Sequence, residues 1–163
     1  MSAPKHVLGI DPASFHVGWC YLENGKYSNS GVISPPKKAD LLTRRNFIRE
    51  AVRELFVAFS SLPDLVVAVE NPMSRSYGTI KILFTIKTLV EELAVVSGWV
   101  HVEVTPSEWH GCVYEEDAKR IDENVKDLAL RLAKVHSDGA IEEQDAADAF
   151  WVARFCYENA RWT

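Results

Sequence analysis

Two short apolar stretches of the chain each end on an acidic residue, and this pattern restricts the fold more than any other. Residues 6–11 read as a strand that ends on Asp11, and residues 65–70 repeat the arrangement with Glu70. The second stretch is almost continuously apolar, which is typical of a strand buried on both faces and paired in parallel. Asp11 alone is also explained as a turn residue, because Asp-Pro favours turns. The repeat at Glu70 favours a shared site, since a buried carboxylate costs free energy unless it is paired.

The remaining segments complete an α/β pattern. Residues 17–22 and 27–33 flank an Asn-Gly pair, a strong signal for a two-residue hairpin. We therefore predict a three-stranded antiparallel meander, then a crossover helix over residues 40–60 and two parallel strands. The remaining predicted elements are the strands 65–70 and 100–104, a short helical turn opened by residues 105–108, and the helices 79–97, 117–135 and 143–159. Apolar residues at helical spacing predict an inward stripe on two of the helices: Leu41, Ile48, Val52, Leu55 and Phe59 on helix 40–60, and Ile82, Ile86, Leu89, Leu93 and Val96 on helix 79–97. The predicted fold class is α/β, a five-stranded mixed sheet flanked by helices, in one domain over residues 1–163.

The last predicted helix carries two acids on the face that should pack inward. At about 100° per residue, Asp145 and Asp148 lie on one side of this helix. They share that side with small or apolar residues, Ala149, Val152 and Cys156. The positive end of the helix dipole explains one exposed acid well, but it does not explain two inward-facing acids. The pattern therefore indicates that this helix contributes to the same site as the strand-terminal acids.

Four carboxylates on three elements are thus predicted to converge: Asp11, Glu70, Asp145 and Asp148. Like charges at close range raise one another's pKa values. The usual remedy is a hard divalent cation with oxygen ligands, and Mg²⁺ or Mn²⁺ suits an all-carboxylate set. Two such ions can hold the attacking and leaving oxygens of a phosphoryl displacement. The sequence has no P-loop and no Cys/His set with zinc-ligand spacing.

The charge distribution leaves two interpretations open. The net charge of −5 argues against general binding to nucleic acids, but residues 37–87 carry nine Lys/Arg against five Asp/Glu. This basic segment is either a localised nucleic-acid footprint or a solvated helix face. No apolar run reaches membrane-spanning length, and the three cysteines are scattered. We therefore expect an intracellular protein, cytoplasmic or in another DNA-containing compartment, that does not act at a membrane.

Three motifs together resemble the RuvC family of Holliday-junction resolving endonucleases. They are Gly-Ile-Asp-Pro at 9–12, Val-Glu at 69–70 and Asp-Ala-Ala-Asp-Ala at 145–149. The resemblance implies a ribonuclease H-like fold, a homodimer and Mg²⁺-dependent cutting of two opposed strands at a four-way DNA junction. It also implies that Asp11 bridges two Mg²⁺ ions, that Glu70 holds one, and that Asp145 and Asp148 hold the other. Mn²⁺ is expected to substitute.

The chain departs from the family pattern where the DNA is contacted. The family often has an aromatic residue just after the acid of the fourth strand, and the nearby residues here are Met73 and Tyr77. The basic residues after the fifth strand are few, and His110 stands where a lysine might be. The residues predicted to contact nucleic acid are Arg75, Tyr77, Lys81, Lys119, Arg120 and Met73. Helix 79–97 is apolar on more than one face, which predicts that it forms the dimer interface.

Two alternative functions remain open from the sequence. One is a ribonuclease H-like nuclease on another substrate, such as an RNA–DNA hybrid, RNA or a different branched DNA. The other is a non-catalytic module that binds DNA or a nucleotide. The second explains neither the inward-facing acids nor the missing glycine-rich phosphate loops. We expect Trp109 to be a core anchor and His110 to be structural.

Overall fold

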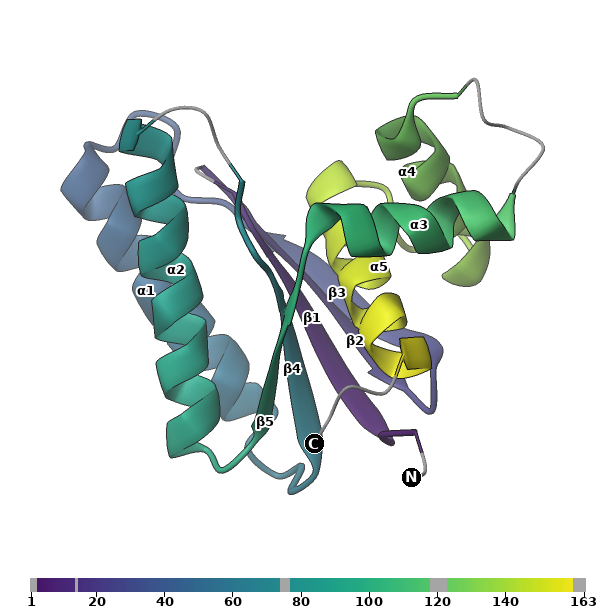
Figure 1. The fold of residues 1–163 in the computed structure, drawn as a ribbon. Coiled ribbons are helices and arrows are strands. Elements are labelled where there is room, and N and C mark those ends of the chain that lie inside the picture. The colour runs from purple at the N-terminus through teal and green to yellow at the C-terminus, as the bar shows by residue number, and fades with distance from the viewer. Residues whose placement is uncertain (1–2, 14, 74–76, 118–122, 160–163) are drawn as a thin grey trace.

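A five-stranded mixed sheet forms the centre of the computed structural model, with helices on both of its faces (Figure 1). The structure describes residues 3–13, 15–73, 77–117 and 123–159, and for residues 77–79 the backbone alone. The strands are β1 (His6–Pro12), β2 (Val17–Glu23), β3 (Lys26–Ile33), β4 (Leu65–Glu70) and β5 (Val100–Val104). Their spatial order is β3-β2-β1-β4-β5, antiparallel from β1 to β3 and parallel from β1 through β4 to β5. The predicted fold class is confirmed.

The turn between β2 and β3 forms as the Asn-Gly pair predicts. Asn24 has a φ of 51° and Gly25 a φ of 74°. A type I′ turn needs positive φ at both central residues, and Asn and Gly adopt it with little strain. The hairpin is therefore encoded locally, and it places β2 beside β1, the strand that carries Asp11.

The helices divide between the two faces of the sheet (Figure 1). Helices α1 (Leu41–Ala58) and α2 (Tyr77–Val96) cover one face. Helix α5 (Gln144–Asn159) covers the other, and α3 (Pro106–Glu116) and α4 (Val125–His136) pack outside it. None of the helices in the described ranges is long and apolar enough to cross a membrane.

Two predicted helix boundaries are wrong. The helix predicted over 117–135 begins at Val125, and the short turn predicted after Thr105 is the 11-residue helix α3. Capping explains both errors. Asn124 accepts a hydrogen bond from the Lys126 backbone N–H and so starts α4. Thr105 and Glu108 form a capping box that starts α3.

The predicted inward stripes of α1 and α2 are correct in the middle of each helix and wrong at one end. Ile48 and Val52 are buried as predicted, but Leu41 is 62% exposed. In α2, Ile86 is buried while Val96 is 85% exposed. Leu41 and Val96 are the first and last residues of their helices, where a side chain has fewer neighbours. The apolar excess that the sequence shows on α2 therefore lies partly on the surface.

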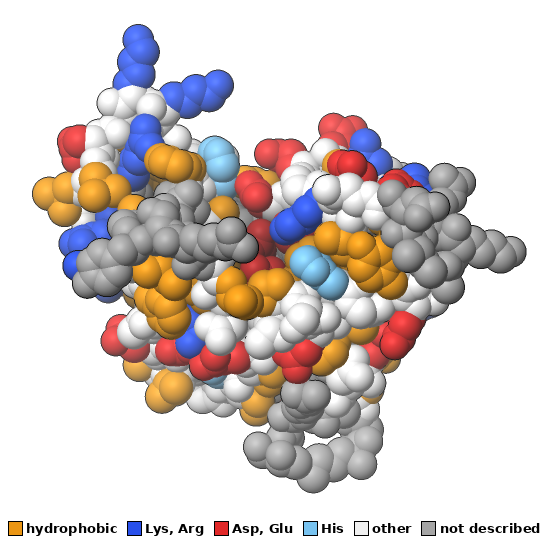
Figure 2. Space-filling model, turned by 45° about the horizontal axis from the view of Figure 1, so that its top comes forward, with side chains coloured by type: hydrophobic (Ala, Val, Ile, Leu, Met, Phe, Trp, Pro, Cys, Tyr) orange, Lys and Arg blue, Asp and Glu red, His pale blue; other side chains and the backbone are white. Residues whose placement is uncertain are grey.

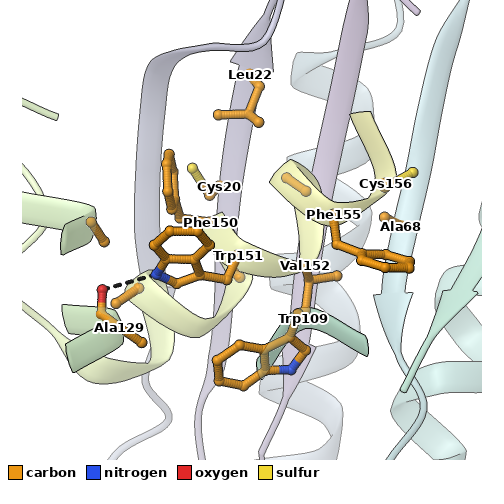
Figure 3. Packing of buried hydrophobic residues seen from close by; sticks show 14 of the residues in the cluster. Cys20, Leu22, Ala68, Trp109, Ala129, Phe150, Trp151, Val152, Phe155 and Cys156 are labelled. Carbon is orange, nitrogen blue, oxygen red and sulfur yellow. Dashed lines mark hydrogen bonds between the residues drawn. The ribbon is translucent and has the colours of Figure 1, made fainter. Parts of the chain in front are cut away.

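Side chains of helix α5 pack directly on the sheet (Figure 3), and two glycines let the helix approach β1 and β2 closely. A Cβ at Gly9 would overlap the carbonyl oxygen of Ala149 and lie 2.8 Å from the backbone nitrogen of Ala153. A Cβ at Gly18 would overlap the backbone carbonyl of Asp145. The missing side chains therefore set the distance between the sheet and the helix that carries two of the acids.

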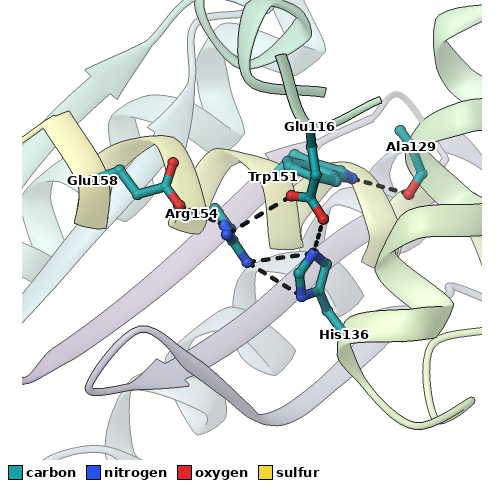
Figure 4. A network of polar contacts seen from close by, with 6 residues as sticks. All are labelled: Glu116, Ala129, His136, Trp151, Arg154 and Glu158. Carbon is teal, nitrogen blue, oxygen red and sulfur yellow. Dashed lines mark hydrogen bonds and ion pairs between the residues drawn. The ribbon is translucent and has the colours of Figure 1, made fainter. Parts of the chain in front are cut away.

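The outer helices are tied to α5 by hydrogen bonds and ion pairs. Trp151 Nε1 donates to the Ala129 carbonyl at 2.9 Å, which joins α5 to α4. His136 of α4 contacts Glu116 of α3, and Arg154 of α5 lies 3.7 Å from the same carboxylate (Figure 4). These contacts hold α4 against α5, the helix that carries Asp145 and Asp148.

We predict that Gly9→Ala destabilises the protein by about 1–3 kcal/mol, because the added methyl group overpacks the interface between β1 and α5. Urea denaturation followed by circular dichroism measures the change. Gly111→Ala in α3 is the matched control, since a Cβ there meets nothing within 4 Å. The control should stabilise α3 by roughly 0.5–1 kcal/mol. Equal effects of the two substitutions would contradict the close-packing interpretation.

Candidate metal-binding active site

All four predicted acids line one hollow at the C-terminal ends of β1 and β4. The hollow has a volume of about 430 Å³, and its walls include Asp11, Glu70, Asp145 and Asp148. Figure 2 shows acidic side chains gathered at the centre of this face, with a basic side chain beside them. Asp11 and Asp148 are buried, whereas Glu70 and Asp145 are partly exposed. The structure therefore brings the whole predicted carboxylate set together.

The alternation of side chains along the strands directs Asp11 and Glu70 to the same face. Asp11 follows Gly9 by two residues, and Glu70 follows Ala68 by two, so each points toward α5. Parallel pairing aligns the C-terminal ends of β1 and β4. Asp145 and Asp148 lie in the first turns of α5, directly above this edge. Open α/β sheets commonly carry their sites at such a position.

Three further side chains contact the acids of the hollow, and sequence analysis did not assign them to the site. Trp109 Nε1 donates a hydrogen bond of 2.7 Å to Glu70 Oε2. Gln144 Nε2 donates to Asp148 Oδ1 at 2.8 Å, and the Lys126 ammonium contacts Asp148 Oδ2. The ammonium also lies 5.0 Å from the centroid of the Trp109 ring, within cation–π range. Trp109 is fully buried as predicted, but its indole N–H also orients a site carboxylate.

Burial raises the pKa values of Asp11, Glu70 and Asp148 more than repulsion between their charges does. The pKa of Asp11 is raised well above its usual value, first by desolvation and then by the charges of Glu70 and Asp148. The pKa values of Glu70 and Asp148 are also raised, again with desolvation as the largest cause. Lys126 opposes the rise at all three carboxyls. The sequence predicted raised pKa values, with repulsion between the acids in a partly desolvated cleft as the cause, and desolvation is the larger contribution.

The donor set of the hollow fits a hard divalent cation. It offers carboxylate oxygens from Asp11, Glu70, Asp145 and Asp148, which are the ligands that Mg²⁺ and Mn²⁺ prefer. Across the described ranges, however, no group of three Asp, Glu, His or Cys side chains is already arranged around one metal position. The ammonium of Lys126 lies among the acids instead. The chemistry fits the ion, and the side chains must rearrange to bind it.

His110 next to Trp109 fits the structural role predicted for it. Its ring packs edge-on against Trp109 at a centroid distance of 4.1 Å. Its Nε2 has no hydrogen-bond partner within the described part of the chain. Desolvation, and then the charge of Lys126, lower the pKa of His110, so the ring is neutral at pH 7.

The residues predicted to contact nucleic acid are only partly placed. Met73 is 77% exposed and lines the acid hollow. Lys81 lies on α2 and lines separate hollows on the α1–α2 side. Tyr77 begins α2 instead of lying in the preceding loop, and its side chain is outside the description. Arg75, Lys119 and Arg120 lie outside the described residues.

We predict that Asp11→Asn stabilises the metal-free protein at neutral pH. The raised pKa means that the folded state binds the proton more tightly than the unfolded chain does. The free-energy cost to the folded state is absent below the pKa of an Asp in the unfolded chain, about 4, and complete above the pKa of Asp11 in the folded protein. It amounts to about 1.4 kcal/mol for each unit by which these two pKa values differ. The melting temperature of wild type should therefore fall relative to Asp11→Asn as the pH rises through this range.

Thermal unfolding in a metal chelator, from pH 4 to pH 8, measures this difference. The exposed acid Asp64 provides the matched control Asp64→Asn, which should leave the melting temperature nearly unchanged. A lower melting temperature for Asp11→Asn than for wild type at pH 8 would show that the Asp11 carboxylate is not a destabilising buried charge.

Comparisons with known proteins find similarity to RuvC. The curated relative "Crossover junction endodeoxyribonuclease RuvC" of Hyphomonas neptunium (strain ATCC 15444) is 41% identical over 59 residues, which is 34% of this chain. The match spans about 35% of the length of that relative. No family model matches the chain.

Solved structures of RuvC from Thermus thermophilus match the fold over nearly the whole chain. One, of RuvC in complex with a Holliday junction substrate, has a TM-score of 0.69 at 18% identity and covers 95% of this chain and 96% of its own. Another has a TM-score of 0.70 at 19% identity, and the match covers 96% of this chain and 95% of that one. The chain has the ribonuclease H-like fold of RuvC, and over a third of its length it is also similar to RuvC in sequence.

Proposed function

We propose that the protein is a metal-dependent endonuclease that resolves four-way DNA junctions by hydrolysing phosphodiesters in two opposed strands. The observation that supports this most is the convergence of Asp11, Glu70, Asp145 and Asp148 on one hollow. Carboxylates so placed suit metal-assisted phosphoryl chemistry. The fold is that of RuvC, and one RuvC structure of this fold is bound to a Holliday junction substrate. The similarity in sequence and fold makes a junction the favoured substrate.

In this proposal the four acids hold Mg²⁺, with two ions per site, and Mn²⁺ can replace it. When bound, the metal polarises the phosphate and makes water a better nucleophile at neutral pH. The chain itself orients the ligands. The Trp109 indole N–H fixes Glu70 Oε2, and the Gln144 amide fixes Asp148 Oδ1. Burial of Asp11 excludes water from one side of the hollow and so strengthens electrostatic interactions within it.

The α1–α2 side supplies a basic surface for the DNA backbone. Arg45, Arg49 and Arg53 of α1 are exposed and line hollows together with Lys81 of α2. The ion pairs of Arg49 and Arg53 with Glu50 lie in solvent and are weak competitors for a phosphate. We assign phosphate contacts to this surface, which corresponds to the basic segment 37–87. The footprint interpretation of that segment is therefore preferred.

Two exposed apolar side chains lie near the hollow and suit unstacked bases at a branch point. Met73 lines the hollow, and Phe15 follows two residues after Ala13, another lining residue. Phe15 is 53% exposed, and the Arg44 guanidinium lies 5.0 Å from its ring centroid. An aromatic face backed by a cation is a common platform for single-stranded bases. Phe15 therefore supplies an aromatic ring on which a base can stack, which Met73 lacks.

Cutting two opposed strands requires two active sites, so the proposal includes a homodimer through α2. Helix α2 exposes Phe84, Val95 and Val96, with exposed fractions of 43%, 71% and 85%. Exposed apolar side chains of this size along one helix commonly mark an interface with another protein surface. The dimer prediction for helix 79–97 stands as part of this proposal.

We predict that Asp11→Asn and Asp148→Asn each lower the rate of junction cleavage by more than about 100-fold and leave junction binding largely intact. The acids hold the metal, whereas the basic groups of α1 and α2 hold phosphates. The measurement uses end-labelled four-way junction, flap, duplex and RNA–DNA hybrid in Mg²⁺, with gel-shift binding in Ca²⁺. The exposed neighbour Glu142 gives the control Glu142→Gln, which should cut normally.

The substrate panel also separates the competing functions. Preferential cutting of the hybrid would assign the ribonuclease H-like alternative, and binding without any cutting by wild type would assign a non-catalytic module. Undiminished cutting by Asp148→Asn would remove that residue from the site.

We predict that Phe84→Glu converts the protein into monomers, because a carboxylate on the exposed face of α2 cannot be buried in an apolar interface. Sedimentation velocity at micromolar concentration measures the oligomeric state. Val135→Glu is the control, since Val135 is 68% exposed on α4, which packs against α5 on the other face of the sheet. A monomeric wild type at these concentrations would refute the dimer through α2.

A further inference from the structure

We infer that Lys126 is the resident counter-cation of the acid hollow, and that a divalent metal ion binds there by displacing the Lys126 ammonium from Asp148. This inference rests on the proposed metal-dependent function and adds a residue that controls how tightly the metal is held. It concerns this chain's own lysine, which sequence analysis left unassigned.

Both carboxylate oxygens of Asp148 already have protein partners. Gln144 Nε2 donates to Oδ1 at 2.8 Å, and the Lys126 ammonium contacts Oδ2. The Asp148 side chain is only 3% exposed, so these two partners take most of the oxygen surface that it could offer a metal ion. A divalent ion at Oδ2 beside the ammonium would place two cations on one carboxylate oxygen, which their mutual repulsion disfavours. Lys126 is the partner that carries positive charge, so it is the one that a divalent cation replaces electrostatically.

The placement of Lys126 on α4 argues against a purely structural role. Lysine is unfavourable in the first turn of a helix, because the helix dipole is positive there. Lys126 nevertheless occupies the first turn of α4, two residues after the Asn124 cap. Asp127 in the same turn suits the helix dipole, but the Lys126 ammonium makes its ion pair with Asp148 of the hollow. The residue therefore serves the hollow, at some cost to its own helix.

The same geometry lets the ammonium leave without unfolding α4. Asn124 accepts a hydrogen bond from the Lys126 backbone N–H at 2.8 Å, so the backbone is anchored independently of the side chain. The Lys126 side chain is 45% exposed and has a path to solvent. The Trp109 ring lies 5.0 Å from the ammonium, and the indole N–H of this residue holds Glu70. Glu70 thus keeps its orientation whether Lys126 or a metal ion neutralises the hollow.

If a metal ion displaces the Lys126 ammonium, a variant that lacks this charge should be less stable without metal and should bind the metal more tightly. Without Lys126, the carboxylates of the metal-free protein lose their counter-cation, so the folded state becomes less stable. The metal ion, on the other hand, no longer competes with an ammonium, so its affinity rises. A lysine that only contacts substrate phosphate would predict weaker DNA binding and an unchanged metal affinity. Metal affinity measured without DNA therefore separates the two roles.

The test compares Lys126→Met with Lys134→Met, a substitution of an exposed lysine on the same helix. Isothermal titration with Mn²⁺ in the absence of DNA measures affinity, and thermal unfolding in a chelator measures metal-free stability. We expect Lys126→Met to bind Mn²⁺ at least about 5-fold more tightly than wild type. Its metal-free melting temperature should be lower than that of wild type, by a few degrees. Lys134→Met should match wild type in both measurements.

Lys126→Arg retains the charge and supplies a second comparison should Lys126→Met fold poorly. It should keep the weaker, wild-type Mn²⁺ affinity. If wild type binds Mn²⁺ and Lys126→Met binds it equally or more weakly, the counter-cation inference is overturned. If wild type does not bind Mn²⁺ at all, the proposed metal-dependent function fails instead. Tighter Mn²⁺ binding by Lys126→Met, with unchanged binding by Lys126→Arg and Lys134→Met, supports the inference.

Discussion

The free energy needed to bury carboxylates at one edge of the sheet is the constraint on which the rest of this structure depends. Asp11, Glu70 and Asp148 are withdrawn from water far enough to raise their pKa values. The N–H groups of Trp109 and Gln144 and the ammonium of Lys126 offset part of this cost. The remainder must come from the packing of the domain, since a carboxylate cluster of this kind does not hold itself together.

In this fold, the elements that hold the buried acids are different from those that carry the exposed basic side chains. β1 is paired on both sides, and α5 is buried along most of its length, so the acids stand on the most enclosed elements of the chain. The opposite face carries α1 and α2, with exposed arginines and apolar side chains that contribute little to the packing under the acids.

The parts that could be predicted from the sequence are those that are encoded locally. Asp11 and Glu70 interrupt apolar strands, and Asp145 and Asp148 interrupt an apolar helix face, so each acid is visible as a break in a periodic pattern. Lys126 breaks no pattern, because it falls in the middle of the helix predicted over 117–135, where a lysine is an ordinary exposed residue. Its role depends on where α4 packs, and that depends on contacts between residues distant in sequence. The start of α4 was missed because one Asn cap outweighs the periodic pattern around it.

Gly9 and Gly18 have a consequence for how such a protein can change over time. The acids of α5 are held at their distance from β1 by the absence of two side chains in the interior. The acid hollow is therefore positioned by the interior, whereas the surfaces of α1 and α2 are free of that task. Under the proposed function, substitutions on those surfaces would alter which nucleic acid is bound and leave the acids where they are. A lineage with this architecture would then diversify its targets without rebuilding the hollow.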